Sequence, residues 1–270
     1  MAIITKITVQ KKLTDRYNIF LDKGKGEEYA FSVDEDVLIK FNLRKGMELD
    51  DFAILEINYQ DDIRKAYNQS IQYLARRMRS ELEVRKYLAD KEISEPVIQE
   101  VIHKLYEYQF LNDDDFAQAF VRTQMNTTDK GIEVIKRELQ EKGIKGEKLQ
   151  KALSEYPLEA QILKAKGLLV KAMKNKTKDS ERILKQKAEQ LLIRKGFPLD
   201  IISLAQEEVE EIHDENEVME ALRFQGEKAH RKYEKYSGFE YEQKMKQTLY
   251  RKGFSIDLIS RFLEEKKEED

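Results

Sequence analysis

Residue types that could catalyse a reaction are sparse in this sequence. The three histidines, His103, His213 and His230, are far apart, and no cysteine is present to act as a nucleophile or a thiolate ligand. The acidic run Asp113–Asp115 cannot converge on one metal ion, because consecutive residues of a helix point about 100° apart. No Gly-rich phosphate loop, zinc-protease motif or serine-hydrolase motif occurs. The residue types therefore predict a protein that is not an enzyme and that needs no cofactor and no metal.

Basic side chains offer a different chemistry, because clusters of Lys and Arg bind phosphates or acidic protein surfaces. Charged residues make up 37% of the chain but its net charge is −3, so a surface of this kind has to be local. Between Glu159 and Lys195 there are eleven basic and four acidic residues, whereas 206–220 holds eight acids and neither Lys nor Arg. The acids of the basic run cannot neutralise it, which favours partner binding over a solvated helix face.

The predicted partner-binding surface combines three sets of basic residues. One set lies at 76–86, where two helices are expected to meet, a second lies between 122 and 142, and the third belongs to the basic run. For any single charge an ion pair on a solvated face is the simpler explanation, so the prediction depends on their density. The predicted residues are Arg76, Arg77, Arg79, Arg85, Lys86, Arg122, Lys136, Arg137, Lys142, Lys171, Lys174, Lys178 and Arg182.

The elements that must position these side chains differ along the chain. Residues 1–60 predict a small α+β module, with alternating, β-branched strands at 3–9, 16–21 and 28–33. Ser32 and Glu35 have the spacing of a capping box. They predict a helix that Gly46 is expected to end.

Two further helix starts are predicted from acids, which stabilise the N-terminal end of a helix dipole. Residues 52–59 fit a strand or a helix, and we favour a helix because Asp50 and Asp51 lead it. Asp113–Asp115 are explained in the same way, as first-turn acids of a helix with Asn112 as its N-cap.

From about residue 61 the pattern is helical and repetitive. Four segments align without a gap, and each contains a Leu, a Lys three positions later, a Gly and then an apolar residue, with Glu92 in place of the first Gly. The aligned Leu residues are 51, 53 and 57 positions apart. The four segments are 86–102, 137–153, 190–206 and 247–263.

The Lys-Gly step predicts the end of a helix, because Gly adopts a positive φ and Lys complements the helix C-terminus. A second helix then begins at Ser94, Pro198 or Ser255, and a leading helix such as 66–78 precedes each pair. We therefore predict a mainly α protein, an elongated array of tandem three-helix repeats after the α+β module. The predicted repeats are 61–110, 111–157, 158–212 and 213–270.

Sequence-specific reading of DNA bases is not expected from these repeats. A helix-turn-helix reader presents short polar side chains and Arg at the start of its recognition helix. The third helices begin SEPVIQE, KGEKLQK, PLDIISL and SIDLISR, and three of these four starts are acidic or apolar. Contact with the phosphate backbone stays open.

Several features of the sequence favour a cytoplasmic, soluble protein. No apolar run approaches the ~20 residues of a membrane span, and the first residues lack the basic-then-apolar order of a secretory signal. The absence of Cys fits a reducing compartment. We expect a monomer with no membrane association, because no exposed apolar run is evident.

Short motifs occur in a fixed order between residues 76 and 153. They are Arg-x-Arg-Ser-Glu-Leu at 77–82, Leu-x-Asp-x-x-Phe-Ala at 111–117, Phe-Val-Arg at 120–122 and Leu-x-x-Lys-Gly-Ile at 139–144. This set resembles the RecX family of RecA regulators, over roughly residues 61–156 and more weakly beyond. Met78 and Glu92 depart from the family pattern, in which Pro and Gly are usual.

The resemblance implies a function that composition alone does not. RecX-like proteins bind filaments of RecA on single-stranded DNA, and they block filament extension or promote the loss of subunits, which damps recombination and DNA repair. It implies that this chain is a non-enzymatic inhibitor of RecA whose basic faces contact RecA or the filament DNA, with several weak contacts combining into avidity. The alternatives are a nucleic-acid-binding helical repeat protein that acts without RecA, and a helical scaffold for another protein.

Overall fold

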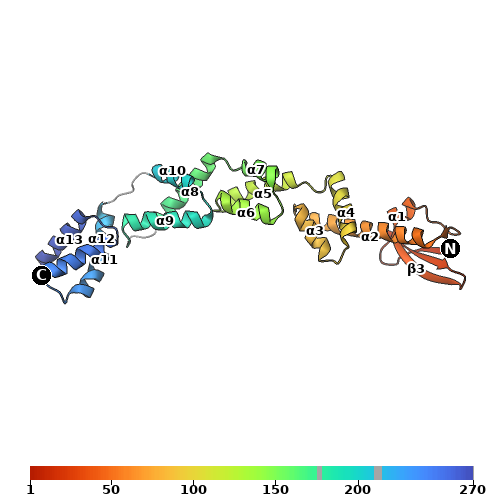
Figure 1. Cartoon of the computed structure of the whole chain (residues 1–270), viewed down its shortest axis with the longest axis horizontal. Helices are drawn as coiled ribbons and strands as arrows, with labels where there is room; N and C mark the ends of the chain where they lie inside the picture. Colours follow the sequence, from red (N-terminus) through yellow and green to blue (C-terminus); the bar gives the residue numbers. More distant parts are fainter. Residues whose placement is uncertain (175–177, 210–214, 270) are drawn as a thin grey trace. The chain divides into compact units, whose positions relative to one another are not determined.

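The computed structural model describes residues 1–174, 178–209 and 215–269, without the side chains of 174, 215–217, 268 and 269 (Figure 1). Its contacts form two compact units. One consists of Met1–Ala117 with Gln140–Lys148, and the other of Gln118–Leu139 with Leu149–Asp270. The described residues are mainly helical after an N-terminal sheet, which confirms the predicted mainly α class with a small α+β module.

The N-terminal sheet has four antiparallel strands in the order β3-β2-β1-β4. The three predicted strands are confirmed as β1 Ala2–Val9, β2 Arg16–Asp22 and β3 Glu27–Asp34. The fourth, β4 Glu48–Leu49, is too short for a sequence pattern to reveal. Inward-facing residues of the sheet, such as Ile4, Ile19 and Val33, form a core with the first helix and the start of the second.

Helix α1 Glu35–Lys40 follows the sheet, but its predicted ends were wrong. Ser32 belongs to β3, where it pairs with Asn18, so strand pairing overrides the capping-box spacing. The N-cap is Asp34, whose side chain accepts a hydrogen bond from the backbone N–H of Asp36. Gly46 is not the helix stop; it adopts φ +85° in the turn that leads into β4.

Helix α2 Asp51–Leu74 confirms the helix favoured at 52–59. Asp50 caps it by accepting a hydrogen bond of 2.7 Å from the backbone N–H of Ala53. The helix runs without a break through residue 60, the predicted module boundary. Ile57 packs in the core of the sheet, whereas Ile63 and Ala66 pack in the core of the first helical unit. One helix therefore belongs to both cores.

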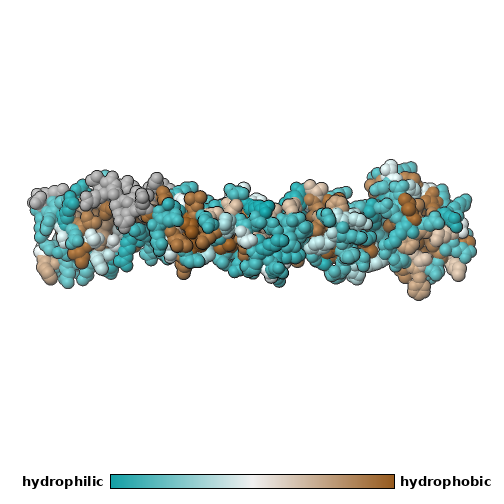
Figure 2. Space-filling model, turned by 90° about the horizontal axis from the view of Figure 1, so that it is seen from above, coloured by the Kyte–Doolittle hydropathy of each residue, from teal (hydrophilic) through white to brown (hydrophobic). Residues whose placement is uncertain are grey.

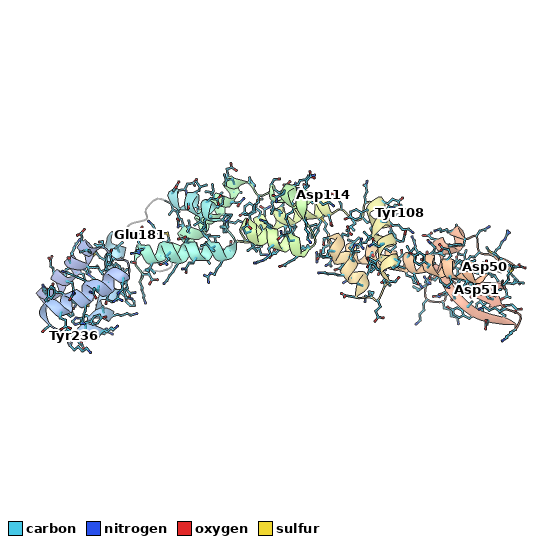
Figure 3. All side chains as sticks on the ribbon, in the orientation of Figure 1. Asp50, Asp51, Tyr108, Asp114, Glu181 and Tyr236 are labelled. Atoms are coloured by element: carbon cyan, nitrogen blue, oxygen red, sulfur yellow. The ribbon has the colours of Figure 1, made fainter. Side chains whose placement is uncertain are left out.

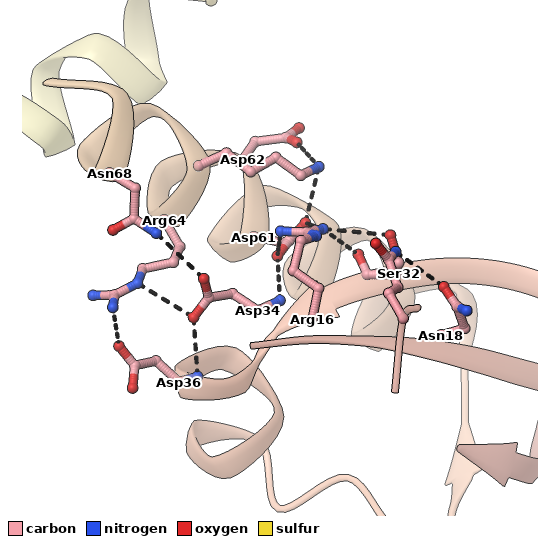
Figure 4. A network of polar contacts seen from close by, with 11 residues as sticks. Arg16, Asn18, Ser32, Asp34, Asp36, Asp61, Asp62, Arg64 and Asn68 are labelled. Atoms are coloured by element: carbon pink, nitrogen blue, oxygen red, sulfur yellow. Dashed lines mark hydrogen bonds and ion pairs between the residues drawn. The ribbon is translucent and has the colours of Figure 1, made fainter. Parts of the chain in front are cut away.

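A buried polar network fixes α2 to the sheet (Figure 4). The carboxylate of Asp61, almost fully buried, accepts hydrogen bonds from Arg16 of β2 at 2.8 Å and from the backbone N–H of Asp34 at 2.7 Å. Arg64, one turn along α2, pairs with Asp34 at 3.3 Å and with Asp36 at 2.5 Å. Removing one member of such a network leaves a buried charge uncompensated, so the contacts specify one orientation of α2.

The remaining helices group in threes along the chain, as the periodicity predicted. In the first group α2 packs with α3 and α4, and in the last two groups the helices surround separate apolar cores. The helices are α3 Glu81–Ala89, α4 Glu95–Glu107, α5 Asp113–Thr127, α6 Ile132–Glu141, α7 Gly146–Leu153, α8 Leu158–Lys174, α9 Glu181–Lys195, α10 Leu199–Glu207, α11 Glu215–Tyr233, α12 Gly238–Arg251 and α13 Ile256–Glu269.

The predicted helix ends at the Lys-Gly steps are confirmed. Gly143, Gly196 and Gly253 have φ values of +87°, +85° and +87°, in the left-handed region that favours glycine. Glu92, at the aligned position of the first repeat, adopts the same region at φ +60° in spite of its side chain. At Gly196, for example, the apolar residue after the Gly forms a hydrogen bond to the last turn of the preceding helix, α9. The Phe197 N–H donates to the Leu192 carbonyl at 3.1 Å.

Candidate partner-binding surfaces

Most of the surface visible in Figure 2 is hydrophilic, and hydrophobic residues occur on it in separate patches. A charged side chain on such a surface is available to a partner only if the chain does not already use it. The predicted basic residues differ in whether they are exposed and in whether they have a partner among the described residues.

Arg77 is used by the fold, between α2 and α3. It donates to the carbonyl of Met78 at 3.0 Å and pairs with Glu83 at 2.8 Å. Glu83 is itself half of a capping box, in which the Ser80 side chain accepts from the Glu83 N–H and the Glu83 carboxylate accepts from the Ser80 N–H. Arg77 therefore holds the residue that starts α3.

Arg79 is also engaged, through an aromatic stack. Its guanidinium lies 4.0 Å from the ring centroid of Tyr73, and Tyr73 stacks on Tyr87 with centroids 4.1 Å apart. Arg76, in contrast, is exposed and forms no ion pair within the described residues. Of these three arginines, Arg76 is the one left for a partner.

Helix α3 contributes one engaged and one available residue. Arg85 pairs with Glu81 at 2.6 Å and with Glu95 at 3.3 Å, and it donates to Gln99 at 3.2 Å. Lys86 is exposed and has no ion pair in the part of the chain that the structure describes.

The second group of helices also carries both paired and unpaired basic residues. Arg122 pairs with Glu155 at 2.7 Å, and Lys136 lies 3.5 Å from Glu133. Arg137 is exposed, and no acid of the described chain lies within ion-pair distance of it. Both pairs are on the surface, where the strength of an ion pair is low, so a partner could displace them at little cost.

Lys142 belongs to a joint between repeats that the sequence did not predict. Its ammonium lies 3.3 Å from the same Glu83 carboxylate that Arg77 binds. Burial raises the pKa of Glu83, but hydrogen bonds from Arg77 and Ser80 and the two positive charges outweigh it, so the pKa is lowered. The adjacent Gly143 packs so closely that a Cβ on it would lie 2.9 Å from the Leu82 Cβ.

The same joint recurs at the next two Lys-Gly steps. The backbone N–H of Gly131 donates to the carbonyl of Lys195 at 2.7 Å, and Glu133 N–H donates to that of Gly196 at 3.0 Å. In the following joint the Ser180 hydroxyl donates to the carbonyl of Lys252. In both of these joints a donor at the start of α6 or α9 bonds a carbonyl at the end of α9 or α12, where the last carbonyls have no partner within the helix. At all three steps a Cβ on the Gly would lie within 3.0 Å of the neighbouring repeat, which favours Gly at this position.

The acids at 113–115 start α5 as predicted, since Asn112 Oδ1 accepts from the N–H groups of Asp114 and Asp115 at 3.0 and 3.2 Å. Asp113 has a second role that sequence reasoning missed. It is buried, and its carboxylate accepts from the backbone N–H of Glu81 at 2.8 Å. Burial raises the pKa of the Asp113 carboxyl, whereas this hydrogen bond and the charge of Lys148 lower it. The effect of burial is larger, so the pKa lies above its usual value.

The basic run, Glu159–Lys195, forms ion pairs with acids outside the run as well as with its own acids. Lys166 pairs with Glu208 at 3.6 Å and Lys195 with Asp129 at 3.3 Å, both acids from outside the run. Lys164 donates to the carbonyls of Met125 and of Thr128, at the end of α5. Acids outside the run therefore contribute to its neutralisation. Lys185 and Lys187 pair with Glu181 and Asp179 at 2.5 and 2.6 Å.

Three of the four predicted residues of the run have described side chains. Lys171 and Arg182 are exposed without an ion pair among the described residues, and the Lys178 ammonium lies 4.7 Å from the ring centroid of Phe224. The side chain of Lys174 and all of Lys176 lie outside the described residues. Part of the acidic segment, 210–214 with His213, lies outside them as well.

The remaining chemistry of the described residues is not that of a metal centre. No group of three His, Cys, Asp or Glu side chains that could hold an ion occurs among them. His103 is exposed, and His230 Nδ1 lies 2.9 Å from the hydroxyl of Tyr241. Nor is any helix within that part of the chain long and apolar enough to span a membrane.

Comparison with known proteins shows which family combines this sheet with these helical groups. Family models match at residues 2–50 (regulatory protein RecX N-terminal domain), 66–105 (RecX, first three-helix domain) and 112–153 (second three-helix domain), and at 159–205 and again 215–263 (third three-helix domain). The chain belongs to the RecX family. Two of its four helical groups therefore match the same RecX domain.

RecX relatives match over the whole chain. The regulatory protein RecX of Bacillus cytotoxicus is 48% identical over 269 residues, covering 100% of both chains. That of Bacillus velezensis is 49% identical over 265 residues, covering 98% of this chain and 99% of the relative. A crystal structure of regulatory protein RecX superposes with a TM-score of 0.68 at 36% identity, covering 77% of this chain and 100% of that one. RecX from Lactobacillus salivarius gives 0.54 at 39%, over 55% and 97%.

Proposed function

We propose that this chain inhibits RecA by binding to RecA filaments on single-stranded DNA, where it blocks extension or promotes the loss of subunits, without catalysing a reaction. The relatives are named as RecX regulatory proteins, which supports a regulatory role. The observation that carries the proposal further is the set of exposed basic side chains left unpaired by the described fold. They recur in successive helical groups, at Arg76 and Lys86, then Arg137, then Lys171.

Such a distribution suits a partner that repeats. One unpaired charge on a surface contributes little, but contacts from several tethered groups to successive subunits of a filament multiply their effective concentrations. The binding is expected to weaken when any one group is changed and to be lost when several are changed together.

The test is to add the full chain to preformed RecA filaments on single-stranded DNA and to follow ATP hydrolysis with time. The wild-type chain should lower the rate progressively. A variant with Arg76→Glu, Lys86→Glu and Arg137→Glu should need at least a tenfold higher concentration for the same effect. Arg77 and Arg79 are excluded from this variant because the fold uses them.

The matched control changes three exposed lysines of the N-terminal module, Lys11→Glu, Lys12→Glu and Lys23→Glu, which alters net charge equally. Equal loss in both variants would show that net charge and not these positions governs the effect. An unchanged rate of ATP hydrolysis with the wild-type chain would overturn the proposal. Binding of DNA without any effect on RecA would favour the alternative, a nucleic-acid-binding repeat protein that acts without RecA.

A further inference from the structure

A cavity of about 230 Å³ lies beside the C-terminal end of α4, and none of the predicted partner-binding residues lines it. Its walls are Arg64 and Tyr67 of α2, Lys104 of α4, and Tyr108 and Phe110, which follow α4 directly. Tyr108 is labelled in Figure 3, at the end of that helix. All five residues belong to the first helical group.

Two of the three aromatic rings of the cavity, Tyr108 and Phe110, contact the third, Tyr67. Tyr108 and Phe110 each stand edge-on to it, with centroid distances of 6.3 and 6.4 Å and interplanar angles of 72° and 77°. Tyr108 is 59% and Phe110 is 53% exposed. Neighbouring aromatic rings left open to solvent at the mouth of a cavity indicate a surface that a ligand covers.

The backbone between these two rings is held in an unfavourable conformation. Gln109 has φ +59°, in the left-handed region that residues with a side chain rarely adopt. Hydrogen bonds fix the turn, from Gln109 N–H to the Tyr106 carbonyl at 3.0 Å and from Phe110 N–H to that of Leu105 at 2.9 Å. Such strain persists where the surroundings impose it, often at binding sites, and here it sets the places of Tyr108 and Phe110.

The charges at the cavity decide which ligand chemistry fits. The Arg64 guanidinium lies 5.8 Å from the Tyr67 ring, but Asp34 and Asp36 already neutralise it. Lys104 is half-buried and forms no ion pair within the described residues. A cationic ligand, which an aromatic cage would otherwise attract, is repelled by this ammonium. The site suits a flat ring with an anionic group beside it.

We propose that this cavity binds one unstacked base of single-stranded nucleic acid, which stacks on Tyr108 or Phe110 while the adjoining phosphate contacts Lys104. Its volume is below the ~300 Å³ at which sites for larger ligands begin, which fits one ring system. Stacked bases on aromatic side chains, with cations along the backbone, are the usual way to hold single strands. An acidic peptide could use Lys104 but would leave both rings uncovered.

The experiment uses the full chain without RecA, so its outcome is independent of the proposed function. The probe is an oligothymidylate with a central 2-aminopurine, whose fluorescence falls when the base stacks on an aromatic ring. The chain contains no Trp that would interfere with the signal. The wild-type chain should quench the probe on binding. Tyr108→Ala and Phe110→Ala should each weaken binding by about 5- to 100-fold.

Conservative variants and a matched control separate stacking from stability. Tyr108→Phe keeps the ring and should bind as the wild type does. Lys104→Gln should reduce the slope of log affinity against log salt by about one. Phe239→Ala removes an aromatic ring that is 82% exposed in the last helical group, and it should have no effect. Circular dichroism and Tm of each variant show that it is folded.

Three results would overturn the proposal. One is equal affinity for an oligonucleotide with an abasic central nucleotide, because phosphate contacts alone would then account for binding. Another is an equal loss of affinity in Phe239→Ala and Tyr108→Ala. The third is displacement of the probe by an acidic peptide of Glu residues, but not by unlabelled oligothymidylate, which would assign the cavity to a protein ligand instead.

Discussion

The carboxylate of Asp113 accepts a hydrogen bond from the backbone N–H of Glu81, 2.8 Å away, so the first residue of α5 caps the first residue of α3. The N–H groups of the first turn of a helix have no partner within the helix, and a buried one has to find a partner elsewhere. The acceptor for this N–H is thus supplied by a residue 32 positions away along the chain.

Removal of this cap should destabilise the protein. Asp113→Ala leaves the partly buried N–H of Glu81 without a partner, and the free energy of unfolding should fall by about 1–3 kcal/mol. Chemical denaturation measures it. Asp114→Ala is the control, because Asp114 is only partly buried and makes one 3.8 Å contact with Lys148, so its loss should change stability by less than about 0.5 kcal/mol. Equal effects in the two variants would contradict the role of Asp113.

A glycine at position 92 should stabilise the chain. Glu92 adopts φ +60°, and an L-residue with a side chain is strained in this region by roughly 1–2 kcal/mol. Part of that gain is offset because Gly loses more entropy on folding. Glu92→Gly should therefore raise the free energy of unfolding by about 0.5–1 kcal/mol, seen as a higher Tm. A lower Tm would mean that Glu92 forms a compensating contact.

The joint at Gly196 can be tested against a glycine of the same conformation. Gly196 and Gly46 both have φ +85°, but a Cβ on Gly196 would lie 2.7 Å from Val134, whereas one on Gly46 meets nothing within 4 Å. Gly46→Ala should cost about 1–2 kcal/mol through backbone strain alone. Gly196→Ala should cost a further ~1–3 kcal/mol from overpacking. Equal losses in thermal or denaturant unfolding would refute tight packing at this joint.

Stability should depend on pH through Asp61. Burial raises the pKa of Asp61, but hydrogen bonds from Arg16, Lys65 and the Asp34 N–H outweigh it, so the folded pKa lies below the unfolded value near 3.8. A lowered pKa means that the stabilisation is complete above the unfolded pKa and is lost as pH falls through the folded one. Asp61→Asn should flatten the acid limb of stability against pH below about 4. Asp15→Asn, at an exposed site, should leave it unchanged.

Charge reversals in the Arg-x-Arg segment should separate stability from binding. Arg77→Glu places a second carboxylate beside Glu83 and should lower the free energy of unfolding by about 1–2 kcal/mol. Arg76→Glu should change it by less than about 0.5 kcal/mol, because Arg76 is exposed and unpaired within the described residues. Parallel Tm measurements decide between the two. A large loss in Arg76→Glu would place it in the fold as well.

Local signals were sufficient to predict the three long strands, the helical repeats and the positive φ at each Lys-Gly step. Each of these depends on residues that are close in the sequence. The capping box at Ser32 failed because pairing with Asn18, a contact within the sheet, overrides a local preference. The density of basic residues also did not reveal that Lys164, Lys166 and Lys195 contact carbonyls or acids from distant segments. Only the folded chain shows which charges are left free.

The joints between repeats could not be predicted for the same reason. Gly131 carries no helix-stop signal, yet its N–H completes the end of α9, 64 positions away along the chain. A glycine before a helix start, aligned with a Lys-Gly step in the next repeat, is the sequence signal that would have found it. The partner-binding residues stay a prediction until the charge-reversal variants are measured.

Because α2 is uninterrupted, it fixes the rotation of the first helical group relative to the sheet about the helix axis. Ile57 and Ile63 lie on the same helix but pack in two different cores. The hydrogen bond between Arg16 and Asp61 fixes the rotation of α2 relative to the sheet. Insertion of a single residue between Ile57 and Ile63 would turn the sheet by about 100° and shift it by about 1.5 Å along the helix axis. The number of residues between these two isoleucines is therefore as constrained as their identity. Insertions or deletions in this segment should be tolerated only when they add or remove whole helical turns.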